Sequence, residues 1–258
     1  MKNKSLCLSF DVEEFDLPRE YGREISDKDM LEISYKGCRR LLEFLNRNNL
    51  KSTLFVSAIF AQAYPRLIRE FAENNEIALH CYSHADYDKD DIRGLKDAKG
   101  ILERISRQKV TGFRAPKFGK VNYKVLNEIG IKYDSSSHPT WIPGRYNNFF
   151  DSRKIKEKDG VKVIPVSVMP FIRAPLFWLA FRNFGLGYAK LGTRACLLNQ
   201  DYVNLVFHPW EFIRLEELNL NLPKIITRNT GDRLENMLEK YVNWCKDKGF
   251  KIKTLKEI

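Results

Sequence analysis

The sequence predicts an α/β protein in which parallel strands alternate with helices and close into a barrel. Short apolar runs recur along the chain, and segments whose apolar residues follow helical spacing separate them. Such alternation favours a parallel sheet with helices outside it, and seven or eight units favour closure of that sheet. Polar and ionisable residues directly follow several of the apolar runs, which is where barrel active sites form. The length of 258 residues suits one barrel domain.

The first half of the chain shows this alternation most clearly. Residues 6–10 form an apolar run that ends abruptly in acids, as a buried strand does. Residues 29–48 carry apolar side chains at helical spacing and end in an Asn-Asn pair, so we expect a long helix there. The same arguments predict strands at 52–56, 76–80 and 110–113, and helices at 65–74, where Pro65 can begin the helix, and at 90–108.

The second half continues the alternation at wider spacing. We expect strands at 131–134, 161–166 and 202–207, helices at 122–129 and 230–248, and a last strand at 251–253. Residues 135–199 are more than one strand–helix unit needs. We therefore predict one domain over residues 1–258, with an insertion within 135–199 that lies over the site.

The cysteines and the N-terminal residues favour a cytoplasmic protein. Five cysteines are present at irregular spacing, and none belongs to a Cys-x-x-Cys pair. Neither a disulfide framework nor a zinc knuckle is indicated, so we expect reduced thiols. Residues 1–8 are too short and too soon followed by acids for a signal peptide, and no run of about 18 apolar residues predicts a membrane span.

Basic residues outnumber acidic ones, which gives a formal net charge of +11. Such an excess can attract nucleic acid, anionic lipid or anionic glycan. The basic residues are scattered, however, and no nucleic-acid motif accompanies them. We therefore expect no nucleic-acid partner.

Residues 171–182 are rich in aromatic residues and arginines, a composition that resembles a membrane-surface segment. One hypothesis is that this segment makes a peripheral contact with the inner membrane and approaches a lipid-linked sugar there. The alternative is an apolar helix packed across the barrel.

His80 and His84 are the first candidates for metal binding. Three residues separate them, directly after a predicted strand, and imidazoles at this spacing can meet one cation. The alternative is a pair of unrelated, satisfied histidines. Asp11 and Glu13 lie two residues apart and face the same way on an extended strand, whereas Glu14 faces the other way. We choose Glu13 as the third ligand and Asp11 as the general base, which leaves coordination positions open for water and substrate.

His208 follows the buried-strand pattern of residues 202–207. A histidine at the mouth of a barrel is a candidate general acid, because its pKa lies near working pH. The alternative is a histidine that caps the strand by hydrogen bonding.

Five short motifs occur in order along residues 9–211. They are Ser9-Phe10-Asp11-Val12-Glu13-Glu14, His80-Cys81-Tyr82-Ser83-His84, Arg114-Ala115-Pro116, Tyr133-Asp134-Ser135-Ser136 and Phe207-His208-Pro209-Trp210-Glu211. This ordered series resembles the polysaccharide deacetylases of carbohydrate esterase family four. The resemblance implies a distorted (β/α)7 barrel and metal-dependent deacetylation of a glycan.

The resemblance also implies roles for single residues. Asp11 would be the base, and His80 and His84 would bind the metal. Arg114 would orient the base through a charge-assisted hydrogen bond. Asp134 would tune His208, which would protonate the leaving amine.

Two positions depart from the common pattern of this family. That pattern has two adjacent aspartates in the first motif, the second of them a metal ligand, whereas Val12 occupies the adjacent place here. The chain is more similar to a subgroup with an Asp-Val-Glu type of first motif, in which the ligand lies two residues on, at Glu13. Lys117 directly follows the Arg-Ala-Pro motif, and it would either neutralise an anionic group of the substrate or point to solvent.

These observations predict a hydrolase that removes an N-acyl group, with N-acetyl as first choice, from an amino sugar in a polysaccharide or a lipid-linked glycan precursor. Zinc is the usual metal for two histidines and a carboxylate, and cobalt, nickel, iron or manganese would also fit. Two alternatives stay open. One is hydrolysis of another C–N bond, such as a cyclic amide or a formamide, on the same barrel, and the other is glycan binding without catalysis.

Overall fold

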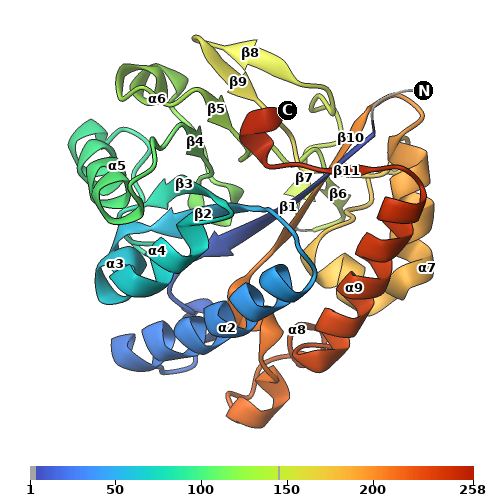
Figure 1. Ribbon diagram of the computed structural model, residues 1–258, viewed down its shortest axis with the longest axis horizontal. Helices are drawn as coiled ribbons and strands as arrows, with labels where there is room; N and C mark the ends of the chain where they lie inside the picture. The colour runs from blue at the N-terminus through green and yellow to red at the C-terminus, as the bar shows by residue number, and fades with distance from the viewer. Residues whose placement is uncertain (1–3, 145) are drawn as a thin grey trace.

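A curled, mostly parallel sheet forms the centre of the protein, and helices cover its outer side (Figure 1). The computed structural model describes residues 4–144 and 146–258. The strand order is β10-β1-β2-β3-β4-β5-β9-β8, with β11 paired to β1, and only β8 and β9 pair antiparallel in this sheet. The strands are β1 (Ser5–Val12), β2 (Thr53–Ser57), β3 (Glu76–Cys81), β4 (Gly112–Phe113), β5 (Tyr133–Asp134), β8 (Lys156–Lys158), β9 (Val161–Val163), β10 (Tyr202–Phe207) and β11 (Lys251–Ile252).

The predicted α/β fold is confirmed, and its sheet is curled into a half-barrel. Within residues 4–144 and 146–258, no strand ladder joins β9 to β10. The backbone after β9 fills that place: the Val166 N–H donates to Ser137 O at 2.9 Å, and the Ser167 N–H donates to Asn204 O at 3.0 Å. Irregular hydrogen bonds thus take the place of a regular strand pair at this seam.

Helices follow most of the strands and bury one apolar face. In α2 (Asp27–Arg47), Ser26 Oγ caps the first turn by accepting a hydrogen bond from the Asp29 N–H at 3.1 Å. Apolar side chains repeat along one face of this helix and are buried, among them Leu41 and Leu45. The other helices are α1 (Leu17–Glu20), α3 (Ala58–Ala63), α4 (Pro65–Ala72), α5 (Ile92–Ser106), α6 (Tyr123–Glu128), α7 (Trp178–Cys196), α8 (Lys224–Thr227) and α9 (Asp232–Asp247).

The four longest central strands lie wholly in the interior. Every residue of β1, β2, β3 and β10 is buried. The five cysteines are also buried, and all of them are free thiols, as the irregular spacing led us to expect.

Residues 135–199 contain more structure than one strand–helix unit. They hold the β6–β7 hairpin (Trp141–Ile142 and Tyr146–Asn147), the β8–β9 hairpin and helix α7. Gly185 interrupts α7 with φ 80° and ψ −176°, a conformation that glycine adopts readily. Among the described residues, no helix combines the length and the apolarity needed to cross a bilayer.

The segment 171–182 divides between surface and core. Phe171 and Ile172 are 82% and 61% exposed, whereas Phe181 is fully buried with its ring against Phe207. The second half of this segment is therefore the packed helix of the alternative hypothesis. Only its first residues are exposed enough to contact another molecule.

Candidate active site

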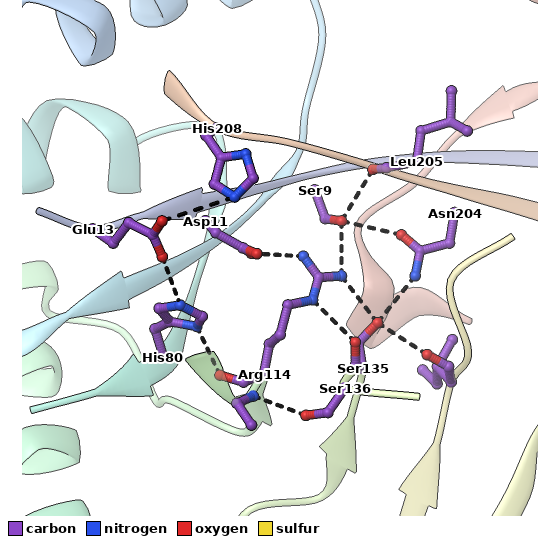
Figure 2. Close-up of polar contacts among 12 residues, drawn as sticks. Ser9, Asp11, Glu13, His80, Arg114, Ser135, Ser136, Asn204, Leu205 and His208 are labelled. Atoms are coloured by element: carbon purple, nitrogen blue, oxygen red, sulfur yellow. Dashed lines mark hydrogen bonds and ion pairs between the residues drawn. The ribbon is translucent and has the colours of Figure 1, made fainter. Parts of the chain in front are cut away.

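The candidate site lies at the carboxyl ends of the parallel strands, where β10, β1, β2, β3 and β4 are neighbours. Asp11 stands on β1, and Glu13 follows its last residue. His80 stands on β3, Arg114 directly follows β4, and His208 directly follows β10. Figure 2 shows that these five side chains converge from their separate strands.

Glu13, His80 and His84 form a buried cluster with the geometry of a metal site. One ligand atom of each residue lies within 4.8 Å of the other two. Glu13 Oε2 is 2.9 Å from His80 Nε2 and 3.1 Å from His84 Nε2, so both imidazoles face the same carboxylate oxygen. Tetrahedral ligands at zinc–ligand distances of about 2.0–2.1 Å lie roughly 3.3 Å from each other, so a small outward movement of these atoms would admit an ion.

Hydrogen-bond acceptors hold the outer nitrogens of both imidazoles. His80 Nδ1 donates to the carbonyl oxygen of Arg114 at 2.7 Å, and His84 Nδ1 donates to Asp16 Oδ2 at 2.8 Å. Because each acceptor requires the proton on Nδ1, Nε2 is the ring atom that faces Glu13, and its lone pair would be free to bind a cation placed there. Metal-binding histidines have this kind of support, and the three residues therefore fit a divalent cation.

The electrostatics of His84 agree with this arrangement. Burial alone would lower its pKa, but the carboxylates of Glu13 and Asp16 outweigh burial and raise the pKa of His84 to about 9. A positive charge between these carboxylates is thus favoured, whether a proton or a divalent cation supplies it.

Asp11 and Arg114 form a buried ion pair beside the cluster (Figure 2). Arg114 Nη1 donates to Asp11 Oδ1 at 2.7 Å, and the side chains are 0% and 7% exposed. Three further guanidinium hydrogens reach Ser9 Oγ, Ser135 Oγ and Ser135 O, each at 3.0 Å. Burial would raise the pKa of Asp11, but Arg114 and then His80 outweigh it and hold this pKa below its usual range. Asp11 is therefore an oriented, ionised carboxylate.

His208 faces the cluster from the end of β10. Its Nε2 lies 3.8 Å from Glu13 Oε1, and its Nδ1 donates to Glu211 Oε1 at 3.2 Å. The ring stacks on Trp210 with 4.5 Å between centroids and meets Trp178 edge-on at 5.1 Å. Burial opposes the charged form, but Glu211 and then Glu13 raise the pKa of His208 above its ordinary value. The protonated form of the ring is thus favoured beside the cluster.

The partner that we expected for His208 was Asp134, and the structure assigns this place to another residue. In the described structure Asp134 makes no hydrogen bond to His208, and it accepts from the Ser136 N–H at 3.0 Å and the Tyr123 hydroxyl at 3.2 Å. Glu211 holds the imidazole instead, because the turn Pro209–Phe212 folds it back onto the preceding histidine. Burial raises the pKa of Asp134 to about 6.

Sequence reasoning missed the roles of two carboxylates, Asp16 and Glu211. Each accepts the Nδ1 proton of a site histidine, His84 in the first case and His208 in the second. The sequence offered a pattern that could have pointed to both residues. Glu211 ends the last motif, and Asp16 ends the acidic run that begins at Asp11. Only the conformations of the two loops show which carboxylate meets which ring.

Glu14 lies on the other side of the chain from Asp11 and Glu13, as the alternation of a strand predicts. Its carboxylate accepts hydrogen bonds from Ser57 Oγ at 2.5 Å and from the His84 N–H at 3.3 Å. It therefore ties the loop of His84 to the start of α3.

A cavity of about 220 Å³ opens over these groups. Its polar floor consists of Asp11, Glu13, Asp16, His84 and His208. Its walls are mainly apolar and include Phe118, Ile142, Phe177, Trp178 and Leu179. Most of these wall residues belong to the segment 135–199, which thus lines part of the cavity.

Lys117 also lines the cavity, and its Nζ lies 2.5 Å from Glu20 Oε1. The side chain is 54% exposed. An internal partner thus holds Lys117 at the lining of the cavity.

The fold and the site together define a class: an α/β half-barrel with a candidate metal site at the carboxyl ends of its strands. Residues 3–133, slightly more than half of the chain, match the family model described as polysaccharide deacetylase, and the chain belongs to this family. The match includes Asp11, Glu13, His80, His84 and Arg114. The family that the motifs indicated is thereby confirmed, while the Asp-Val-Glu subgroup stays a prediction.

Solved structures show similarity of fold. A putative polysaccharide deacetylase from Mycobacterium smegmatis is 20% identical with a TM-score of 0.66, over 99% of this chain and 88% of that chain. A peptidoglycan N-acetylglucosamine deacetylase is 16% identical with a TM-score of 0.54, over 100% and 89%. A CE4 family pseudoenzyme from Bacillus anthracis is 15% identical with a TM-score of 0.56, and 99% of this chain covers 65% of that longer one. A search among curated proteins found no match.

Proposed function

We propose that the protein is a metal-dependent hydrolase that removes an N-acyl group, with N-acetyl as first choice, from an amino sugar. One observation carries this proposal: three metal-ligand atoms, an ion-paired aspartate and a histidine converge on one cavity. Membership of the polysaccharide deacetylase family supports a glycan as the substrate.

Glu13, His80 and His84 would hold the cation. A divalent ion bound there would polarise the acyl carbonyl and increase the acidity of a water molecule. Zinc suits two imidazoles and a carboxylate, and cobalt, nickel, iron and manganese accept the same ligands.

Asp11 is the proposed general base. It lines the cavity two residues before Glu13, and Arg114 fixes its orientation through Oδ1. A carboxylate in this place can accept the proton of water as the water attacks the amide carbonyl.

His208 is the proposed general acid. The departing nitrogen must be protonated, because an amine anion is a very poor leaving group. Glu211 holds Nδ1, which leaves Nε2 on the side of Glu13 and the cavity. The stacked ring of Trp210 restricts the imidazole to this orientation.

Metal binding is the first test. Protein stripped with a chelator and reloaded with zinc should melt at a higher temperature than the stripped protein. His84→Gln should weaken zinc binding by about tenfold or more, whereas His138→Gln, which changes a buried histidine outside the cluster, should bind zinc as the parent does. Equal zinc affinity of the parent and His84→Gln would exclude this cluster as the metal site.

Acyl release is the second test, and it separates the proposal from its alternatives. We expect acetate release from N-acetylglucosamine oligomers that stops on chelation and returns with metal. Release from N-formyl sugars or cyclic ureides alone would favour hydrolysis of another C–N bond. Binding of the oligomers without any release would favour a binding protein, an outcome that the fold allows because a pseudoenzyme shares it.

A further inference from the structure

Two loops of the segment 135–199 carry apolar side chains that face solvent, with the half-buried Phe149 between them. We call Trp141, Phe149, Phe150, Phe171 and Ile172 the aromatic rim. Trp141 is 46% exposed, Phe150 95%, Phe171 82% and Ile172 61%. Exposed apolar side chains that gather in one place mark contacts with another molecule.

Contacts between the two loops make the aromatic rim one surface. The ring of Phe149 lies 6.5 Å from that of Trp141 and 5.4 Å from that of Phe150. The Trp141 N–H donates to Arg173 O at 3.2 Å, and the guanidinium of Arg173 lies 5.5 Å from the ring of Phe149. Phe171 and Ile172 directly precede Arg173 and complete the surface.

The stability of the fold does not explain the aromatic rim. Phe171 has φ 63° and Arg173 has φ 56°, in the left-handed region that bulky residues avoid. This conformation is unfavourable for a bulky residue, and Phe171 gains almost no burial in return. A strained backbone that presents an aromatic side chain to solvent indicates a function outside the chain.

The aromatic rim lies beside the cavity of the candidate site. Ile142, which follows Trp141, lines that cavity, and so does Pro175, two residues after Arg173. The cavity wall continues inward with Phe177 and Trp178. An apolar surface therefore leads from the rim to His208.

The charge around the aromatic rim favours an anionic partner. Arg173 Nη1 is buried and has no hydrogen-bond partner among the described residues. Burial, and next the positive charge of Arg153, lower the pKa of Arg173, although Asp151 opposes this. Arginine stays charged under such conditions, so a cation without a full set of partners lies under the rim. The formal net charge of the whole chain is +11.

We propose that the aromatic rim docks the protein onto a membrane that contains anionic lipid, and thereby presents the cavity to an amino sugar carried on a lipid. The second half of this statement rests on the proposed function. Single aromatic side chains that protrude from loops beside a cation suit insertion among lipid headgroups. We therefore assign the membrane contact to the aromatic rim and not to the whole segment 171–182. Phe181 is buried, and Trp178 packs against His208.

Sedimentation with vesicles tests the docking. The full chain should bind vesicles of phosphatidylcholine with phosphatidylglycerol, and bind pure phosphatidylcholine much less, with binding weakened by salt. The double variant Phe150→Ser/Phe171→Ser should bind the anionic vesicles about tenfold or more weakly. The matched control is Phe184→Ser/Leu191→Ser, which changes side chains that are 67% and 61% exposed on α7, outside the rim.

The outcomes are distinct. Failure of the parent to bind anionic vesicles, or equal losses in the rim variant and the control, would overturn the docking, and the rim would then fit a protein partner instead. Hydrolysis of a soluble N-acetyl sugar should be equal in the parent and the rim variant, whereas hydrolysis of a vesicle-bound amino-sugar lipid should fall in the rim variant. Vesicle binding without hydrolysis of any sugar would leave the docking intact and refute the proposed function.

Discussion

At the residue scale, Arg114 decides how the proposed base is held. Its guanidinium is fully buried and donates to Asp11 Oδ1, to Ser9 Oγ and to both oxygens of Ser135. A buried charge is tolerated when such partners satisfy it, and removal of one partner leaves an uncompensated charge. The orientation of Asp11 is therefore fixed by its neighbouring strands and not by solvent-exposed side chains.

Asp11→Asn should lower the turnover number about a hundredfold or more, because an amide accepts no proton from the attacking water. Deacetylation rates at saturating metal measure this. Asp134→Asn is the matched control, since Asp134 is also buried but bonds to Ser136 and Tyr123. Its turnover should stay close to that of the parent, and equal losses in the two variants would show that Asp134 acts in the site after all.

His138 gives the molecule a pH dependence that is separate from the proposed metal site. It lies in the cavity wall with its ring against Phe118 and Tyr146, and burial lowers its pKa from 6.5 to about 4. Between these pH values the unfolded chain binds a proton at this position and the native state does not. The free energy of unfolding therefore falls as the pH falls from 6.5 towards 4, by on the order of 2–3 kcal/mol.

Urea unfolding of the parent and of His138→Gln at pH 7 and pH 4.5 measures this contribution. The variant should lose less stability on acidification than the parent. The comparison of the two proteins is needed because the raised pKa of Asp134, about 6, acts in the opposite direction. The same pH dependence in both proteins would mean that His138 takes up its proton at the same pH in the native and the unfolded protein.

At the scale of the elements, buried strands and long amphipathic helices could be predicted from the sequence. The expected strand 202–207 coincides with β10, the expected strand 6–10 lies within β1, and the expected helix 29–48 lies within two residues of α2. In these elements the apolar pattern is a direct consequence of burial. Elements of two residues such as β6 and β7 are too short to show a period of two, so the apolar pattern does not reveal them.

More of the candidate site than of the smaller elements could be predicted from the sequence. Asp11, Glu13, His80 and His208 stand at or near the ends of buried strands, and strand order brings such ends together. Their hydrogen-bond partners could not be predicted, because loop conformation decides them. The turn after β10 is the clearest case, since it places Glu211 where Asp134 was expected.

Gly37 sets the distance between α2 and that turn. A Cβ at this position would lie 2.3 Å from Pro209 O and 2.8 Å from Trp210 Cα. Gly37→Ala should therefore push α2 away from the turn and lower the free energy of unfolding by about 1–3 kcal/mol. Turnover should fall as well, because His208 stacks on Trp210.

Gly100→Ala in α5 is the matched control, measured in the same urea titration. An added Cβ there meets nothing within 4 Å, so alanine should raise the free energy of unfolding by about 0.5–1 kcal/mol. Equal stability of the two variants would mean that α2 can move away from the turn without loss of packing.

At the scale of the whole molecule, the two halves of the chain contribute different parts of the candidate site. The family match, residues 3–133, contains the cluster of Glu13, His80 and His84 and the Asp11–Arg114 pair. The later residues contribute His208, the apolar cavity wall and the aromatic rim. The proposed chemistry therefore needs a fixed junction between the halves.

A buried ion pair stabilises the position of His208 in this junction. Arg182 Nε donates to Glu211 Oε2 at 2.5 Å, and both side chains are 0% exposed. Arg182 Nη2 also donates to Ile226 O at 3.0 Å. The other oxygen of Glu211 accepts from the His208 N–H at 2.7 Å and from its Nδ1 at 3.2 Å. Helix α7, which carries Arg182, is thus linked to the proposed general acid through one carboxylate.

Arg182→Met should lower the free energy of unfolding by about 3–5 kcal/mol, because it leaves Glu211 buried without a counter-charge. The double variant Arg182→Met/Glu211→Gln should recover much of this loss, since removal of both charges is tolerated better than removal of one. Its turnover should nevertheless stay reduced, because a neutral glutamine supports the protonated ring of His208 less than a carboxylate does. Urea unfolding and deacetylation rates on the same samples separate the two effects. If Arg182→Met and the parent had the same midpoint of urea unfolding, apolar contacts alone would hold α7 in place. His208 would then depend on α7 only through Trp178.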